Sequence, residues 1–145
     1  MRKIGLYSKS INDQNLKFIK KLVDCIREEI APQLLLHENL VNIPSLYDPA
    51  QDQVFSGADL ISSSVELLIS FGGDGTLLDT VTMIKNSDIP ILGINAGRLG
   101  FLANITQDDI VSAVRVIKDQ KFRIDERTVV EISNAKDLNG VGCAF

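Results

Sequence analysis

The sequence predicts an α/β protein, with a Rossmann-like, mostly parallel sheet that has helices on both faces. Apolar runs typical of strands alternate along the chain with segments whose apolar residues recur every three or four positions, as in helices. The runs VELLISF (65–71) and ILGIN (91–95) are nearly continuously apolar. Such runs are typical of strands that are buried on both faces of a parallel sheet.

The first half of the chain begins with a predicted strand at Lys3–Tyr7. Asn12 or Asp13 can cap the helix that follows, and Pro32 ends it. One face of that helix carries its apolar residues, which are Leu16, Ile19, Val23, Ile26 and Ile30. A second strand is expected at Gln33–His37. Residues 38–58 are expected to be loop with at most one turn of helix.

The second half continues the alternation with a strand at Val65–Phe71, a helix from Thr76 to Lys85 and a strand at Ile89–Asn95. Thr106 and Asp109 resemble a capping box at the start of another helix. That helix presents its apolar residues on one side, and they are Ile110, Val114 and Ile117. Three further apolar segments are predicted to be strands, namely Arg123–Glu126, Thr128–Ser133 and Val141–Phe145.

Composition limits the function classes. The chain has 145 residues, which favours one domain, and its net charge of −4 argues against a nucleic-acid partner. The longest run without a charged residue is nine residues, too short for the roughly 20 apolar residues of a membrane helix. Cys25 and Cys143 favour two reduced thiols in a cytoplasmic protein. His37 is expected at the surface.

Two glycine-rich segments follow the two buried strands. The carboxyl ends of parallel strands lie at one edge of a sheet, and ligands of such sheets bind there. We therefore expect the segment after Phe71 and the segment after Asn95 to face a common crevice.

The first segment is Gly72-Gly73-Asp74-Gly75-Thr76. Its glycines and the start of a helix suit a phosphate group, because backbone N–H groups can approach the anion there. Asp74 would repel phosphate, so it needs a role: it helps to hold a divalent cation, or it accepts a proton from an attacking hydroxyl. From four letters alone, a tight strand-to-helix turn without a ligand is equally open, and Thr76 could cap the helix or contact a ligand.

The second segment runs from Leu92 to Ala103 and reads LGINAGRLGFLA. From the residues alone, Phe101 could be a core residue or an aromatic wall against a base, and the core is favoured. Arg98 is interpreted as a solvated surface charge.

Together, FGGDGT (71–76) and LGINAGRLGFLA (92–103) resemble the NAD kinase family. GGDGT alone is shared with diacylglycerol-type and sphingosine-type lipid kinases and, more distantly, with phosphofructokinases. The second segment separates these families, because the lipid kinases would have a proline-containing loop that ends in G-T-G-N.

The resemblance implies transfer of the ATP γ-phosphoryl group to the 2′-hydroxyl of the adenosine ribose of NAD, which gives NADP. It implies that Asp74 is catalytic, that Gly73, Gly75 and Thr76 lie at the nucleotide, and that Phe101 lies near the adenine of NAD. It also implies Mg²⁺ as cofactor, although we name no metal ligand of the protein, and ATP or polyphosphate as donor.

The resemblance also divides the chain. Residues 1–125 are expected to form the α/β nucleotide-binding domain, and residues 126–145 the start of a truncated β-rich NAD-binding domain. We therefore expect the 145-residue chain alone to have little or no kinase activity, and the full-length protein to be a dimer or tetramer. The alternatives are a diacylglycerol-type lipid kinase domain and a non-catalytic nucleotide-binding α/β domain.

Overall fold

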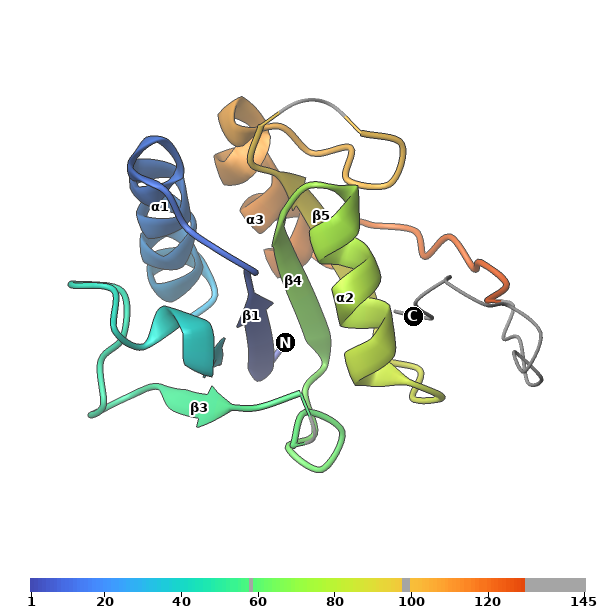
Figure 1. Ribbon diagram of the computed structural model, residues 1–145, viewed down its shortest axis with the longest axis horizontal. Helices are drawn as coiled ribbons and strands as arrows, with labels where there is room; N and C mark the ends of the chain where they lie inside the picture. The colour runs from blue at the N-terminus through green and yellow to red at the C-terminus, as the bar shows by residue number, and fades with distance from the viewer. Residues whose placement is uncertain (58, 98–99, 130–145) are drawn as a thin grey trace, which may run out of the picture.

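A five-stranded, entirely parallel sheet forms the centre of the protein in a computed structural model that describes residues 1–57, 59–97 and 100–129 (Figure 1). The strands are β1 (Lys3–Tyr7), β2 (Gln33–His37), β3 (Gln53–Phe55), β4 (Leu67–Gly72) and β5 (Ile91–Asn95). Their order across the sheet is β3-β2-β1-β4-β5. This is the strand order of the Rossmann fold, so the predicted fold class is confirmed.

One face of the sheet is covered by α1 (Asp13–Glu29) and α3 (Ile110–Lys118), which also pack against each other (Figure 1). Asn12 caps α1, since its side-chain oxygen accepts a hydrogen bond from the Asn15 N–H at 2.9 Å. Between helices and sheet lies the larger core cluster, whose helical members are Ile19, Leu22, Val23, Ile26, Ile110, Val114 and Ile117. All but two of the apolar positions predicted for these helices are therefore fully buried in that core.

The opposite face of the sheet carries α2 (Asp74–Ile84) (Figure 1). A smaller core cluster lies on this face. That cluster contains Tyr7, Leu35, Phe55, Leu60, Val65 and Leu68, with Met83, Ile84 and Ile89 packed against it. Only Thr80 of α2 is buried, so this helix covers its face of the sheet incompletely. Helices on both faces are confirmed, and α2 begins at Asp74, two residues before the predicted start.

Three local predictions were wrong. A short strand, β3, lies within the predicted loop 38–58, whereas the 3₁₀ turn at Glu38–Leu40 agrees with the one helical turn allowed there. The Thr106 hydroxyl donates to the Asp109 carboxylate at 2.6 Å and caps no backbone group. His37, expected at the surface, is only 6% exposed, because its ring packs edge-on between the rings of Tyr7 and Phe55.

The segment Arg123–Glu126 is not a strand, which corrects a fourth prediction. Its side chains are exposed, and Ile124 is 60% exposed. Among the described residues it pairs with no other segment, and a strand forms only when its backbone groups find a partner. Thr128 and Val129 are also not in a strand, whereas the rest of Thr128–Ser133 and all of Val141–Phe145 lie outside the described residues.

No helix within the described ranges is long and apolar enough to cross a membrane.

Candidate functional site

A pocket of about 330 Å³ lies at the carboxyl edge of the sheet. It is lined by Ser10, Asn15, Gly72, Gly73, Thr76, Asn95, Ala96 and Gly97. These residues end β4 and β5, follow β1, β4 or β5, or belong to the first turns of α1 and α2. The chain adds β2 and β3 on one side of β1 and then adds β4 and β5 on the other side. Ligands of open α/β folds bind at the carboxyl ends of the two strands where this order reverses, here β1 and β4. The expected common crevice is therefore present, and both glycine-rich segments border it.

Asp74 joins the two glycine-rich segments directly. One carboxylate oxygen, Oδ2, accepts a hydrogen bond from the Phe101 N–H at 2.8 Å. The other, Oδ1, accepts from the N–H groups of Leu102 at 3.0 Å and Ala103 at 3.2 Å. These three bonds, with that of Phe101 the strongest influence, lower the pKa of the Asp74 carboxyl. The carboxylate is therefore ionised at neutral pH, at the first residue of α2, where the helix dipole also favours a negative charge.

The glycines around Asp74 divide into two kinds. A Cβ on Gly72 would lie 2.3 Å from Oγ1 of Thr76, and a Cβ on Gly100 would lie 2.2 Å from Oδ1 of Asp74. These two positions leave no room for a side chain. A Cβ on Gly73 or Gly75 would meet nothing within 4 Å, and neither residue has a left-handed backbone. Packing within the chain therefore does not explain Gly73 and Gly75, whereas close approach of a ligand to the backbone would.

The remaining predicted site residues differ in their placement. Thr76 lines the pocket, and its N–H bonds the carbonyl of Gly73 at 3.0 Å. Phe101 is 92% exposed, so its interpretation as a core residue was wrong. Its ring is presented to solvent, while its backbone is attached to Asp74. Arg98 lies outside the described residues.

Two amide side chains that neither glycine-rich motif marks as functional, those of Asn95 and Gln107, shape the pocket. Asn95 is 3% exposed, and its Oδ1 accepts from the Gly97 N–H at 2.8 Å. Nε2 of Gln107 donates to the Ala96 carbonyl at 2.6 Å and to Oδ1 of Asn15 at 3.4 Å. These bonds hold the turn after β5 against the first turn of α1. The position of Asn95, a polar residue at the end of a buried strand, was the available signal.

Asp79, five residues after Asp74, has a structural role. Its Oδ2 accepts a hydrogen bond from the Tyr7 hydroxyl at 3.1 Å and pairs with Nζ of Lys9 at 3.3 Å. Burial, followed by the bond to Asp79, raises the pKa of Tyr7 to about 12. This cluster ties the end of β1 to α2 and keeps the Asp79 carboxylate engaged there.

The described residues contain no group of three or more His, Cys, Asp or Glu side chains that could hold a metal ion. Asp74 is not among the residues that line the pocket, and both of its oxygens are engaged by backbone N–H groups. A dedicated all-protein cage for a divalent cation therefore does not fit this part of the chain. Mg²⁺ is commonly bound by one or two carboxylates together with substrate phosphates.

The fold and site define a doubly wound α/β domain with a glycine-rich crevice at the carboxyl edge of its sheet. The ATP-NAD kinase N-terminal domain family matches residues 8–122, and the chain belongs to this family. The family resemblance inferred from the two motifs is thus confirmed.

Individual relatives agree with this assignment. The NAD kinase of Flavobacterium psychrophilum is 37% identical over 135 residues, a match that covers 89% of this chain and 41% of the relative. The NAD kinase of Sulfurimonas denitrificans is 42% identical, with 84% of this chain and 48% of the relative covered. The crystal structure of yeast NADH kinase complexed with NADH has a TM-score of 0.70 at 18% identity and shares the fold over 83% of this chain and 39% of that chain. The chain spans less than half the length of these relatives.

Proposed function

We propose that this chain supplies the phosphoryl-transfer site of an NAD kinase, which moves the γ-phosphoryl group of ATP to the 2′-hydroxyl of the adenosine ribose of NAD. The observation that carries the proposal is the ionised carboxylate of Asp74 at the start of α2, beside the open backbone of Gly73 and Gly75. The names of the two bacterial relatives support the choice of reaction.

The proposed mechanism assigns a task to each part of this site. The N–H groups of Asp74 and Gly75, the first two of α2, point out of the helix N-terminus and can bind phosphate oxygens, whereas the next two bond the carbonyl of Gly73. Asp74 accepts the proton that the 2′-hydroxyl loses as its oxygen attacks the γ-phosphorus. Thr76 contacts the nucleotide from the pocket wall, and the exposed ring of Phe101 offers an aromatic surface to adenine.

Mg²⁺ would neutralise phosphate charge in such a reaction. Because the described residues contain no group of three or more His, Cys, Asp or Glu side chains that could hold a metal ion, we expect the phosphates of ATP to supply most of its ligands. The donor is proposed to be ATP, with polyphosphate as the alternative.

The test uses a chimera of this chain followed by the remaining C-terminal half of the Sulfurimonas denitrificans NAD kinase, assayed for NADP formation from NAD and ATP. Asp74→Ala should lower the rate by about 10²- to 10⁴-fold, the usual contribution of a general base. Asp24→Ala, at an exposed position of α1, is the matched control and should retain the rate. Circular dichroism should be the same for all three proteins.

A near-normal rate for folded Asp74→Ala would overturn the assignment of Asp74. A chimera that folds and binds NAD and ATP without forming NADP would favour a non-catalytic nucleotide-binding domain instead.

We also propose that the complete enzyme is a cytoplasmic homo-oligomer and that the α/β domain ends near residue 125. A free thiol at Cys25 supports the compartment, and the exposed side chains of residues 121–129 after α3 support the boundary. Gel filtration of the chimera tests the oligomer, which should elute above the monomer mass.

A further inference from the structure

The segment Gly100–Ala103 is held at its two ends by different means. Ala103 is 1% exposed, its carbonyl accepts from Nδ2 of Asn95 at 3.4 Å, and its Cα lies 3.0 Å from the position of a Cβ on Gly93. Phe101, two residues earlier, is 92% exposed. Packing therefore fixes the Ala103 end, while the backbone of Phe101 is held by its bond to Asp74.

The backbone of the segment Gly100–Ala103 packs closely around the carboxylate of Asp74. Both oxygens of Asp74 are used, and three N–H donors leave the carboxylate little capacity for another partner. Gly100 lies directly against the carboxyl group, because a Cβ at Gly100 would be within 2.7 Å of the Cγ, Oδ1 and Oδ2 atoms of Asp74. Any residue other than glycine at position 100 would push the carboxylate and the segment apart.

A carboxylate in this arrangement is a poor proton acceptor. N–H donors stabilise its charged form, and a proton can be added only at the expense of one or more of those bonds. Oδ2 has one donor, from exposed Phe101, whereas Oδ1 has two donors near the packed end of the segment. Oδ2 is therefore the oxygen that is more readily released.

We propose that Asp74 is a positioning residue for the segment Gly100–Ala103 as well as a base, and that its Oδ2–Phe101 bond must open before Oδ2 can accept a proton from a substrate hydroxyl. The second half of this statement rests on the proposed function. In that step the hydroxyl O–H bond breaks and an O–H bond forms on Oδ2. The hydroxyl oxygen forms a bond to the γ-phosphorus of ATP as the bond from that phosphorus to the β,γ-bridging oxygen breaks, and ADP leaves. The backbone of Phe101, and with it the exposed ring, is released at the same time.

Amide hydrogen exchange of the 145-residue chain, followed by NMR, tests the positioning role. Asp74→Ala should speed exchange at Phe101 and Leu102 by about tenfold, as expected for loss of a charge-assisted bond. Asp74→Asn should speed exchange at Phe101 alone, because a carboxamide has one acceptor oxygen and would keep it on the two donors of Leu102 and Ala103. Unchanged exchange at Phe101 in both variants would overturn the proposal.

Gly100→Ala provides a second route to the same open state, with the carboxylate still present. It should speed exchange at Phe101 in the wild-type background and have no further effect in the Asp74→Ala background. The matched control is Gly97→Ala, in the same loop region, where a Cβ meets nothing within 4 Å. An effect of Gly100→Ala that is equally large without Asp74 would contradict the proposed contact.

The coupling to proton transfer is tested by the pH profile of kcat in the chimera described above. Opening the contact with Gly100→Ala removes hydrogen bonds from the carboxylate, so the acidic limb of the profile should move to higher pH. If Gly100→Ala speeds exchange at Phe101 but leaves the acidic limb of the kcat profile at the same pH, the coupling between the Oδ2–Phe101 bond and proton transfer is overturned. Failure of the proposed function gives a different result, namely normal activity of Asp74→Ala.

Discussion

His37 is a buried titratable side chain outside the crevice. Its ring centroid lies 4.8 Å from that of Tyr7 and 5.2 Å from that of Phe55, with both contacts edge-on. Its Nδ1 accepts a hydrogen bond from the Asn39 N–H at 3.3 Å. Burial lowers the pKa of His37 below 6.5, and the nearby charge of Glu38 opposes this only in part. The imidazole is therefore neutral in the folded protein at neutral pH.

This burial predicts a pH dependence of stability. Below pH 6.5 the unfolded chain protonates His37 while the folded protein does not, so the free energy of unfolding falls as the pH falls through that range. The loss levels off once the pH is below the folded-state pKa. His37→Phe, which keeps an aromatic ring, should lose less stability than the wild type in urea titrations between about pH 7.5 and about pH 5.5. Equal losses in the two proteins would show that His37 does not titrate in this way.

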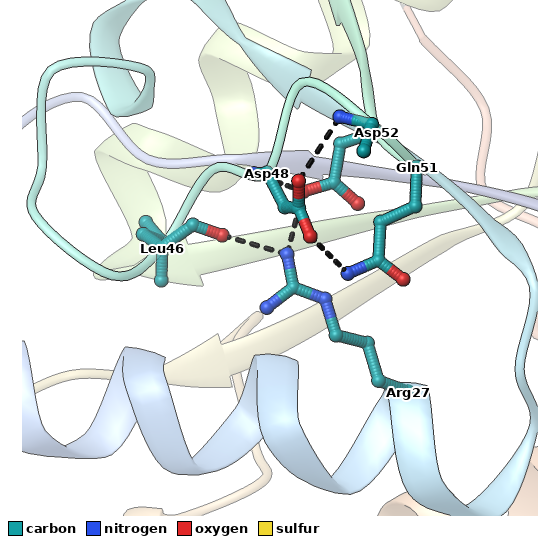
Figure 2. A network of polar contacts seen from close by, with 6 residues as sticks. Arg27, Leu46, Asp48, Gln51 and Asp52 are labelled. Carbon is teal, nitrogen blue, oxygen red and sulfur yellow. Dashed lines mark hydrogen bonds and ion pairs between the residues drawn. The ribbon is translucent and has the colours of Figure 1, made fainter.

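At the scale of elements, α1 is tied to the loop that precedes β3 by a buried ion pair (Figure 2). Nη2 of Arg27 donates to Oδ2 of Asp52 at 2.5 Å and to the Leu46 carbonyl at 2.9 Å. The same Asp52 oxygen accepts from the Asp48 N–H at 2.8 Å. Because the Asp52 side chain is only 2% exposed and β3 begins at the next residue, this network fixes the entry into the edge strand.

Asp52→Ala should lower the free energy of unfolding by about 2–4 kcal/mol, because it leaves the guanidinium of Arg27 largely buried without its charge partner. The matched control is Asp125→Ala. Asp125 pairs with Arg127, but both side chains are well over half exposed, so the loss should stay below about 0.5 kcal/mol. Urea denaturation measures both, and similar losses would contradict the structural role of the Arg27–Asp52 pair.

The end of α1 offers a stabilising substitution. Ala31 follows the C-cap Ile30 and has φ of 50°, a conformation that costs an L-residue with a Cβ but not glycine. Ala31→Gly should therefore raise the free energy of unfolding by about 0.5–1 kcal/mol. Ala113→Gly, inside α3, should lower it by about 1 kcal/mol. If thermal denaturation finds both variants destabilised, the left-handed conformation of Ala31 at the end of α1 is contradicted.

Elements with a long pattern could be predicted from the sequence, and short ones could not. The apolar stripe of α1 and the continuous run of β4 specify both an element and its burial. The run of β5 specifies the strand but not its burial, because β5 is the last strand of the sheet and its residues 91–93 are only partly buried. β3 has three residues, and two of them are exposed, so it carries no such pattern. Arg123–Glu126 shows the opposite case, since its composition suits a strand but the described residues provide no neighbour for it.

At the scale of the whole molecule, the parallel sheet brings Gly72 and Asn95 to one edge as paired neighbours. The crevice could be predicted because β4 and β5 are parallel strands joined by a helix, and such strands end at the same edge of the sheet. The bonds from Asp74 to residues 101–103 could not be predicted, because they depend on the path of a glycine-rich loop that has no periodicity. The burial of Asn95 could not be predicted for the same reason.

The central claim is that this carboxyl edge binds the phosphates of a nucleotide. The most direct test is an NMR titration of the ¹⁵N-labelled 145-residue chain with ATP and Mg²⁺. We expect the largest shifts at Gly73, Gly75 and Thr76. Lys3 and Gln33, at the opposite edge of the sheet, should not move. Shifts centred on that opposite edge, or no shifts at millimolar nucleotide, would contradict the claim.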